Sequence, residues 1–220
     1  MKRTIACVLF DLDGTLLDTS YDFSWALNTL RAEEGLPPVP YWQVRQCISQ
    51  GGKAVVQLGF PDATADALES LRQRFLKLYH DHIAVHTTLF PTLDQSIRTL
   101  ADKGLPWGIV TNKPEWLTHR LLDHIPFADP PRTVVCGDTL PVRKPHAQPL
   151  LLAAQQCGVA AENCLYIGDH PRDIEAPLNA GMLSGAALYG YLPQKVDPMQ
   201  WPAHFFYHTP VDILRHLEQL

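Results

Sequence analysis

Six short apolar runs recur along this chain of 220 residues, and they constrain its fold more than any other feature. In chain order they are IACVLFD, LPWGIVTN, RTVVCGD, NCLYIGD, SGAALYG and HFFYHT. Each is about as long as a strand and is rich in Val, Ile, Phe or Tyr. Continuous apolar runs, unlike alternating ones, are typical of strands that are covered on both faces. The runs therefore predict one buried parallel sheet.

Segments with helical periodicity separate most of these runs. The segment TLDQSIRTLADKG has apolar residues at Leu93, Ile97 and Leu100, and Gly104 follows where a helix would end. The segments EWLTHRLLDHI and QPLLLAAQQCG have similar patterns. Strands that alternate with helices predict an α/β fold with a doubly wound parallel sheet, and ligands of such sheets bind at the carboxyl ends of the strands.

The segment of residues 17–85 has a different pattern, with no convincing strand. It predicts three helices, at residues 21–34, 41–58 and 63–82, with breaks at GLPPVP and GFPDAT. We therefore expect an all-helical domain of residues 17–85, inserted after the first strand. Residues 1–16 and 86–220 would together form the α/β domain.

Composition and charge exclude several classes of partner. Hydrophobic residues make up 46% and charged residues 19%, which is ordinary for a globular protein. The net charge of −5 gives no basic footprint for nucleic acid. No apolar segment approaches the roughly 18 residues of a membrane helix. We therefore expect neither nucleic acid nor a membrane as a partner, and the sequence leaves a monomer and a homodimer open.

The N-terminal run and the cysteines favour a cytoplasmic location. The apolar run of residues 5–10 ends at Asp11, which makes it too short for the core of a secretory signal. The five cysteines form no CxxC pair, and three lie inside apolar runs. This pattern indicates reduced, buried thiols.

Polar residues that can carry chemistry follow four of the predicted strands. They are Asp11 and Asp13 after the first run, Thr111 and Asn112 after the second, Lys144 after the third, and Asp169 and Asp173 after the fourth. Parallel strands bring these loops to one edge of the sheet. Carboxylates packed this closely repel one another unless a cation lies among them, and oxygen ligands point to a hard ion, most simply Mg²⁺.

The four loops resemble the motifs of the haloacid dehalogenase superfamily of phosphohydrolases. DLDGT is similar to the first motif, TNK to the second, the lysine of RKPHAQP to the third and GDHPRD to the fourth. The helical insertion resembles the first cap type of that superfamily. Within that superfamily, the chain resembles phosphoglycolate phosphatases and a sister group that acts on N-acetylmuramic acid 6-phosphate. The segments that carry this resemblance are CGDTLPVRKPHAQPLLLAAQQCGV, GDHPRDIEAPLNAG and YGY.

Phosphate ester hydrolysis needs a nucleophile, a proton for the leaving oxygen and neutralisation of charge. We expect Asp11 to be the nucleophile that forms an aspartyl-phosphate, and Asp13 to act as general acid and then as base for water. Lys144 would place a positive charge beside the phosphoryl group. Asp169 would bind Mg²⁺ beside Asp11 and the carbonyl of Asp13.

The remaining site residues are expected to hold the substrate or the ion. Thr111 and the amide of Asn112 would bind phosphoryl oxygens. Gly14 would let the backbone bend, so that N–H groups of the turn face those oxygens. The resemblance implies that Asp173 assists at the metal ion. The substrate would be a small phosphate ester that carries a carboxylate.

The helical segment contains two candidates for recognising the substrate. Lys53 follows two glycines that precede a predicted helix, an arrangement that can bind an anion. The resemblance implies that this loop faces the active site, and a solvated lysine remains the alternative. Arg45 is the second candidate for the substrate carboxylate. His82 and His86 have a spacing that suits a metal ion, but solvated or capping histidines are the commoner outcome.

Four rival functions compete with this expectation, and the presence of Asp13 argues against one of them, a dehalogenase. A phosphatase of other sugar specificity and a phosphomutase would use the same pair of aspartates. A dehalogenase would be expected to lack Asp13. A non-catalytic binding module would be expected to lose a catalytic group, and none is missing from the motifs.

Overall fold

A parallel sheet lies at the centre of the protein. The computed structural model describes residues 4–194 and 196–220. The sheet has six strands in the order β5-β4-β1-β6-β7-β8, and all pairings are parallel. The strands are β1 (Cys7–Phe10), β4 (Trp107–Val110), β5 (Thr133–Val135), β6 (Cys164–Gly168), β7 (Leu183–Ala187) and β8 (Phe205–Tyr207). Each of the six predicted strands is confirmed.

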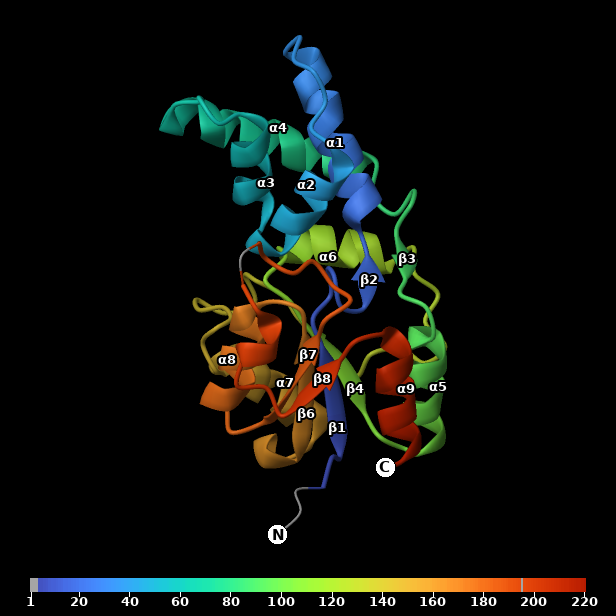
Figure 1. The fold of residues 1–220 in the computed structure, drawn as a ribbon. Coiled ribbons are helices and arrows are strands. Elements are labelled where there is room, and N and C mark those ends of the chain that lie inside the picture. The colour runs from blue at the N-terminus through green and yellow to red at the C-terminus, as the bar shows by residue number, and fades with distance from the viewer. Residues whose placement is uncertain (1–3, 195) are drawn as a thin grey trace.

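Helices cover both faces of this sheet. Helices α5 (Leu93–Asp102) and α9 (Pro210–Glu218) lie on one face, and α7 (Gln148–Cys157) and α8 (Pro171–Asn179) lie on the other (Figure 1). Helix α6 (Glu115–Leu122) follows β4. Every residue of β1, β4, β6 and β7 is buried, as the continuous apolar runs predict for a sheet covered on both faces. The predicted α/β fold is therefore confirmed.

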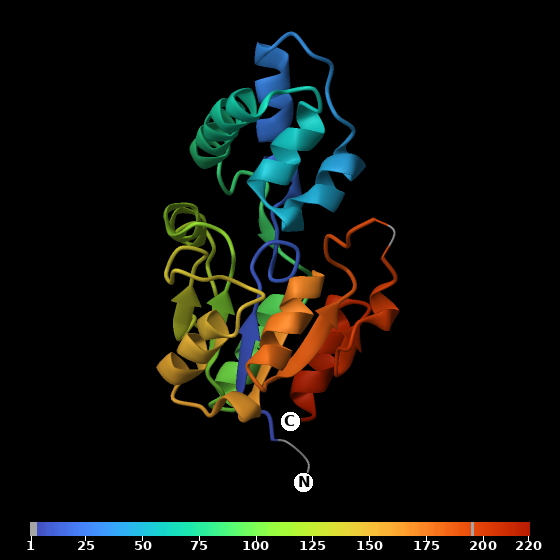
Figure 2. The ribbon, with the colours of Figure 1, turned by 90° about the vertical axis from the view of Figure 1, so that its left-hand side faces the viewer.

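Four further helices lie beyond the carboxyl ends of the strands, as Figures 1 and 2 show. They are α1 (Ser20–Glu33), α2 (Tyr41–Cys47), α3 (Gly52–Gly59) and α4 (Ala65–Asp81). The single helix predicted over residues 41–58 is wrong. A 3₁₀ turn, Ile48–Gln50, follows α2, and Gly51 then takes a φ of +91° before α3 begins. Only glycine adopts that conformation readily, so the helix breaks there.

A short ribbon joins the helical segment to the sheet. Strand β2 (Leu17–Asp18) pairs in antiparallel fashion with β3 (Thr88–Leu89). The expectation that residues 17–85 contain no strand is therefore wrong, although β2 has only two residues. The pairing places the two chain connections between sheet and helical segment side by side.

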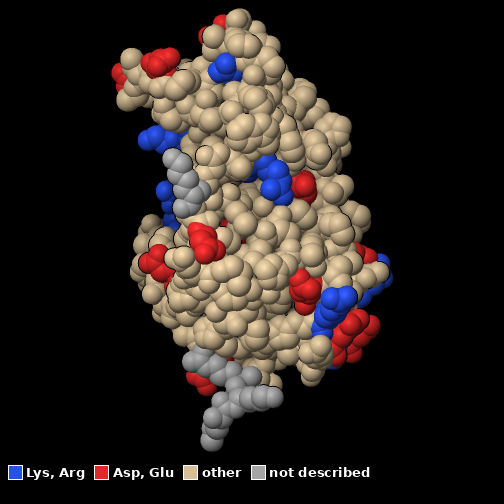
Figure 3. All heavy atoms as spheres, viewed as in Figure 1, with Lys and Arg blue, Asp and Glu red and all other residues tan. Residues whose placement is uncertain are grey.

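The apolar core is continuous across this connection. One cluster contains Phe10 and Trp107 of the sheet together with Leu27 of α1 and Phe75 of α4. A second cluster fills the opposite face of the sheet, beneath α7 and α8. In the described part of the chain, no helix combines the length and the apolar character needed to cross a membrane. On the face visible in Figure 3, basic and acidic side chains are scattered and form no large patch of one sign.

Candidate active site

Three buried carboxylates meet at the carboxyl edge of the sheet. Asp11 follows β1, Asp169 follows the neighbouring strand β6, and Asp173 lies in the first turn of α8. One oxygen of each lies within 4.8 Å of an oxygen of the others. The structure thus brings together three of the residues predicted to bind a metal ion.

The environment of these carboxylates suits a divalent cation. Burial raises the pKa of Asp169 well above its usual range, and the neighbouring charges of Asp11 and Asp173 raise it further. Burial also raises the pKa of Asp11, although Lys144 opposes the effect. Asp169 Oδ1 is buried and has no hydrogen-bond partner among the described residues. Oxygen ligands and an unpartnered buried oxygen fit a hard ion such as Mg²⁺.

Lys144 supplies a buried positive charge to this edge. Its Nζ lies 2.9 Å from Asp11 Oδ1 and 2.8 Å from Asp173 Oδ1, and it donates to the carbonyl oxygen of Val110 at 2.9 Å. Burial disfavours the ammonium, but the two carboxylates outweigh it and raise the pKa of Lys144. Lys144 is therefore held beside Asp11 as a fixed cation.

Asp173 has a second role at the start of α8. Its Oδ2 accepts a hydrogen bond from the His170 backbone N–H at 3.1 Å, and the His170 side chain accepts one from the helix in return. This reciprocal cap orients the carboxylate, so that its Oδ1 faces Lys144. One residue thus caps the helix and belongs to the carboxylate cluster.

Asp13 and Asp11 have different polar partners. Its carboxylate accepts hydrogen bonds from Lys113 Nζ at 3.0 and 3.2 Å and from Thr19 Oγ1 at 2.7 Å. Lys113 also donates to the Tyr79 hydroxyl at 3.0 Å. Burial lowers the pKa of Lys113, and the charge of Asp13 opposes that shift. Asp13 is therefore tied to both the second motif loop and the helical segment.

The loop after β4 carries Thr111 and Asn112. The Asn112 side chain donates to the Lys144 carbonyl oxygen at 3.0 Å and accepts from the Lys144 N–H at 3.1 Å. Asn112 therefore locks the lysine loop with its side chain. Its backbone N–H is free of hydrogen bonds to the described residues. Both Thr111 and Asn112 line the cavity described below.

Gly14 bends the backbone as predicted, but its own N–H does not face the site. Its N–H donates to the Leu17 carbonyl oxygen at 2.9 Å, so it is not available to a phosphoryl oxygen. Its φ is +84°, and a Cβ placed there would lie 2.2 Å from Asp169 Oδ2. Glycine is required because the backbone of this turn runs directly against the carboxylate cluster.

A cavity of about 530 Å³ opens above these residues, between the helical segment and the sheet edge. Asp11 and Asp13 line it on the sheet side, and Ile48, Gly51 and Gly52 line it on the helical side. Its basic lining residues are Lys53, Arg72, Lys113, Arg143, Lys144 and Arg172. A cavity with this lining suits an anionic ligand.

The two candidates for recognising the substrate lie in different places. Lys53 is exposed and lines the cavity, where it can meet a ligand. Arg45 is absent from the lining. Its guanidinium donates to the carbonyl oxygens of Tyr189 and Gly190 at 3.1 and 3.0 Å, and stacks over the Tyr191 ring. Arg45 thus attaches the helical segment to the sheet domain, which argues against the predicted contact with a substrate carboxylate.

Comparison with known proteins identifies the family. A family model described as haloacid dehalogenase-like hydrolase matches residues 8–187. The chain belongs to the haloacid dehalogenase-like hydrolases. The match covers all four loops that carry the site residues and includes the helical segment.

Relatives of this hydrolase are named for two substrates. A phosphoglycolate phosphatase of Xanthomonas campestris pv. campestris is 42% identical over 203 residues, which cover 92% of each chain. An N-acetylmuramic acid 6-phosphate phosphatase of Pseudomonas aeruginosa is 37% identical over 221 residues, which cover 100% of this chain and 98% of the relative. With the family match, these relatives confirm the prediction of a phosphatase.

The fold of the hydrolase also has a close counterpart among solved structures. A chain from Haemophilus somnus, described as a predicted phosphoglycolate phosphatase, superposes with a TM-score of 0.85 at 23% identity. The superposition covers 96% of this chain and 97% of that one. At this identity the likeness supports the fold alone.

Several residues of the hydrolase's site were not predicted from the sequence. Lys113 is part of the TNK motif, and Arg143 precedes Lys144, so proximity to a motif was a usable signal for both. Ser49 gave no such signal. Its hydroxyl donates to Asp169 Oδ2 at 3.0 Å, across 120 residues of sequence. Arg172 contacts the Ser49 carbonyl oxygen, which closes the same edge of the site.

Proposed function

We propose that this protein is a Mg²⁺-dependent phosphomonoester hydrolase that acts through an aspartyl-phosphate on a small phosphate ester carrying a carboxylate. The observation that carries the proposal is the contact of Asp11 with Lys144, beside two further buried carboxylates and below a basic cavity. A carboxylate nucleophile and a phosphate dianion repel each other unless nearby positive charge offsets theirs. Lys144 provides part of that positive charge.

In the proposed mechanism Asp11 attacks the phosphorus atom, and the leaving oxygen takes a proton from Asp13. The Asp11–phosphoryl bond then breaks when Asp13 removes a proton from the attacking water. Lys144 stays against Asp11 throughout, and Lys113 keeps Asp13 in position. Thr111 and Asn112 line the cavity, and in this proposal the free N–H of Asn112 and the hydroxyl of Thr111 would donate to the phosphoryl oxygens.

The residues that would hold Mg²⁺ are Asp11, Asp169 and the carbonyl oxygen of Asp13, with Asp173 supporting them. When bound, the ion supplies positive charge that offsets the negative charge of the transferred phosphoryl group. The orphan Oδ1 of Asp169 supports this assignment, because a buried carboxylate oxygen without a partner is unfavourable.

We further propose that residues 17–85 act as a cap domain over the sheet domain. Ser49 of this segment donates to Asp169, and Arg45 attaches to the loop of residues 189–190. A cap that closes on the sheet edge excludes bulk water and selects the leaving group. Lys53 is the proposed cap residue that binds the substrate carboxylate.

The substrate class is supported by the two relatives. These relatives are named for phosphoglycolate and N-acetylmuramic acid 6-phosphate, and each of these compounds combines a phosphate with a carboxylate. Both anionic groups suit a cavity lined by six basic residues. A cytoplasmic location is also proposed, supported by five free cysteines.

A screen of purified protein against phosphoglycolate, N-acetylmuramic acid 6-phosphate and common sugar phosphates tests the substrate class. We expect Mg²⁺-dependent phosphate release that is highest with one of the two carboxylated esters and is abolished reversibly by EDTA. Equal rates on sugar phosphates that lack a carboxylate would contradict the carboxylate preference. Full activity in a metal-free preparation would contradict the metal requirement.

A further inference from the structure

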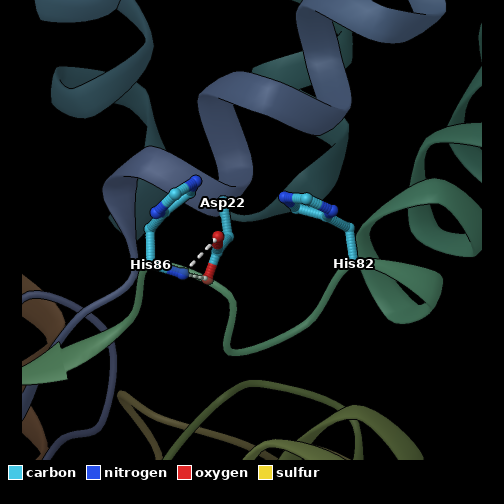
Figure 4. A group of neighbouring side chains, drawn as sticks. All are labelled: Asp22, His82 and His86. Carbon is cyan, nitrogen blue, oxygen red and sulfur yellow. Dashed lines mark hydrogen bonds between the residues drawn. The ribbon is translucent and has the colours of Figure 1, made fainter.

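A second group of metal-ligand side chains lies at the connection between the helical segment and the sheet. Asp22 comes from the first turn of α1, and His82 and His86 come from the segment between α4 and β3. Figure 4 shows the Asp22 carboxylate between the two imidazole rings. One donor atom of each residue lies within 4.8 Å of the others.

Asp22 is fixed in place and still has acceptor capacity. It is fully buried, and its Oδ2 accepts from the N–H and hydroxyl of Thr87 at 3.0 and 2.7 Å. Its Oδ1 accepts only from the His86 N–H, at 3.0 Å, within the described part of the chain. A carboxylate oxygen has two lone pairs, so Oδ1 can take one more partner.

The two imidazoles are also available. His82 Nε2 is buried and has no hydrogen-bond partner among residues 4–194 and 196–220. The His82 ring is held by stacking on Trp25, with ring centroids 3.6 Å apart. Leaving a buried ring nitrogen unpartnered is unfavourable, so this nitrogen points to a missing ligand. His86 is exposed and its ring lies 6.0 Å from that of His82.

We propose that Asp22, His82 and His86 bind a divalent transition-metal ion of the Zn²⁺ class. Two imidazoles and one carboxylate are ligands that such borderline ions prefer, whereas the oxygen-only cluster at Asp11 suits Mg²⁺. Tetrahedral ligands about 2.0–2.2 Å from Zn²⁺ lie roughly 3.3 Å apart, so donors that are within 4.8 Å of one another must close around the ion. The exposed His86 can make that movement, and water takes the fourth position.

The position of the site gives it a mechanical consequence. The ion joins the start of α1, which follows β2, to the segment that leads into β3. These are the two connections between the helical segment and the sheet. Because the ion binds the folded arrangement more tightly than the unfolded chain, Zn²⁺ raises the melting temperature, by up to about 5–10 °C at a hundredfold excess over Kd.

The experiment measures Zn²⁺ binding to the full-length protein in millimolar Mg²⁺, by titration calorimetry and thermal melting. His82→Gln and His86→Gln should each weaken one Zn²⁺ equivalent by more than about 10-fold and remove the melting shift. His80→Gln is the matched control, because this half-buried histidine in the last turn of α4 pairs with Asp81 and is not a member of the cluster. It should leave binding unchanged.

The exposed position of His86 keeps the test valid if His82→Gln fails to fold. Zn²⁺ bound at the Asp11 cluster would persist in both histidine variants. The test therefore concerns only the Zn²⁺ ion whose binding depends on His86. Unchanged Zn²⁺ stoichiometry, affinity and melting shift in His86→Gln would overturn the proposal. The cluster would then serve only to anchor the backbone of residues 86–87 to Asp22.

Discussion

Lys113 Nζ lies 3.0 Å from Asp13 Oδ1 and 3.0 Å from the Tyr79 hydroxyl, so one buried ammonium joins the proposed acid–base residue to helix α4. The same nitrogen lies 4.7 Å from the centre of the Phe23 ring in α1. The carboxylate of Asp13 and the helical segment therefore depend on the same cation for their positions.

Replacement of Lys113 by Met should destabilise the fold. The side chains of Lys113 and Asp13 are only 4% and 15% exposed, and removing one partner of such a pair leaves an uncompensated charge. We expect a loss of about 3–5 kcal/mol in the free energy of unfolding, measured by urea denaturation. The double variant Asp13→Asn/Lys113→Met should recover part of this loss, because no lone charge remains.

The exposed pair of Lys77 and Asp81 provides the control for that experiment. Its side chains are 76% and 52% exposed, so Lys77→Met should cost less than about 0.5 kcal/mol. If the losses in the two single variants Asp13→Asn and Lys113→Met simply add in the double variant, the two residues are not coupled.

The proposed division of work between Asp11 and Asp13 predicts two different losses of activity. Asp11→Asn should abolish turnover, because an amide cannot accept the phosphoryl group as a carboxylate does. Asp13→Asn should lower kcat by roughly 10²–10⁴, the usual contribution of general acid–base catalysis. Steady-state kinetics on proteins checked for deamidation by mass spectrometry measure both. Wild-type turnover in Asp11→Asn would show that the nucleophile is another residue.

Binding of Mg²⁺ should release protons and weaken as the pH falls. Burial raises the pKa values of Asp11 and Asp169, so the metal-free cluster holds protons to a higher pH than ordinary carboxylates do. The ion requires the ionised form, and therefore its binding expels these protons. Calorimetry in two buffers with different heats of ionisation counts them. The apparent Kd for Mg²⁺ should rise towards acid pH. A Kd that is constant from neutral to mildly acid pH, with no proton release, would contradict Mg²⁺ binding to these carboxylates.

The sheet and the carboxylate cluster could be predicted because their signals are local. A continuous apolar run followed by Asp occurs within a few residues, as at Asp11 and Asp169, and parallel topology then brings the ends together. The ribbon of β2 and β3 could not be predicted in this way. Its strands have two residues each, too few to show an alternating pattern, and Leu17 pairs with Leu89, 72 positions further along the chain.

The parts of the site that depend on tertiary packing were also missed or misplaced. Lys113 is buried because Phe23 and Tyr79 of the helical segment cover it, and its own neighbours in sequence do not reveal that. Arg45 has the charge of a substrate ligand, but the carbonyl oxygens that it binds lie about 145 residues further along the chain. Residue type predicts what a side chain can bind, whereas the fold decides which partner it meets.

Lys53 and Arg45 make a matched pair for testing where specificity lies. Lys53 lines the cavity, so Lys53→Ala should remove a contact with the substrate carboxylate. Loss of a hydrogen bond to a charged group costs about 1.5–3 kcal/mol, which corresponds to a roughly 10- to 150-fold higher KM for the preferred carboxylated ester. The KM for p-nitrophenyl phosphate, which lacks the carboxylate, should change little. Lys53→Arg should retain most of the preference.

Arg45→Ala should affect both esters to the same extent. Its guanidinium holds the helical segment against the loop of residues 189–190, so its loss loosens that attachment whatever the leaving group is. Steady-state kinetics of the three variants on the two substrates separate recognition from attachment. Equal losses on both esters in Lys53→Ala would show that Lys53 does not bind the carboxylate. A selective loss in Arg45→Ala would assign that contact to Arg45, and would require Arg45 to leave Tyr189 and Gly190 when substrate binds.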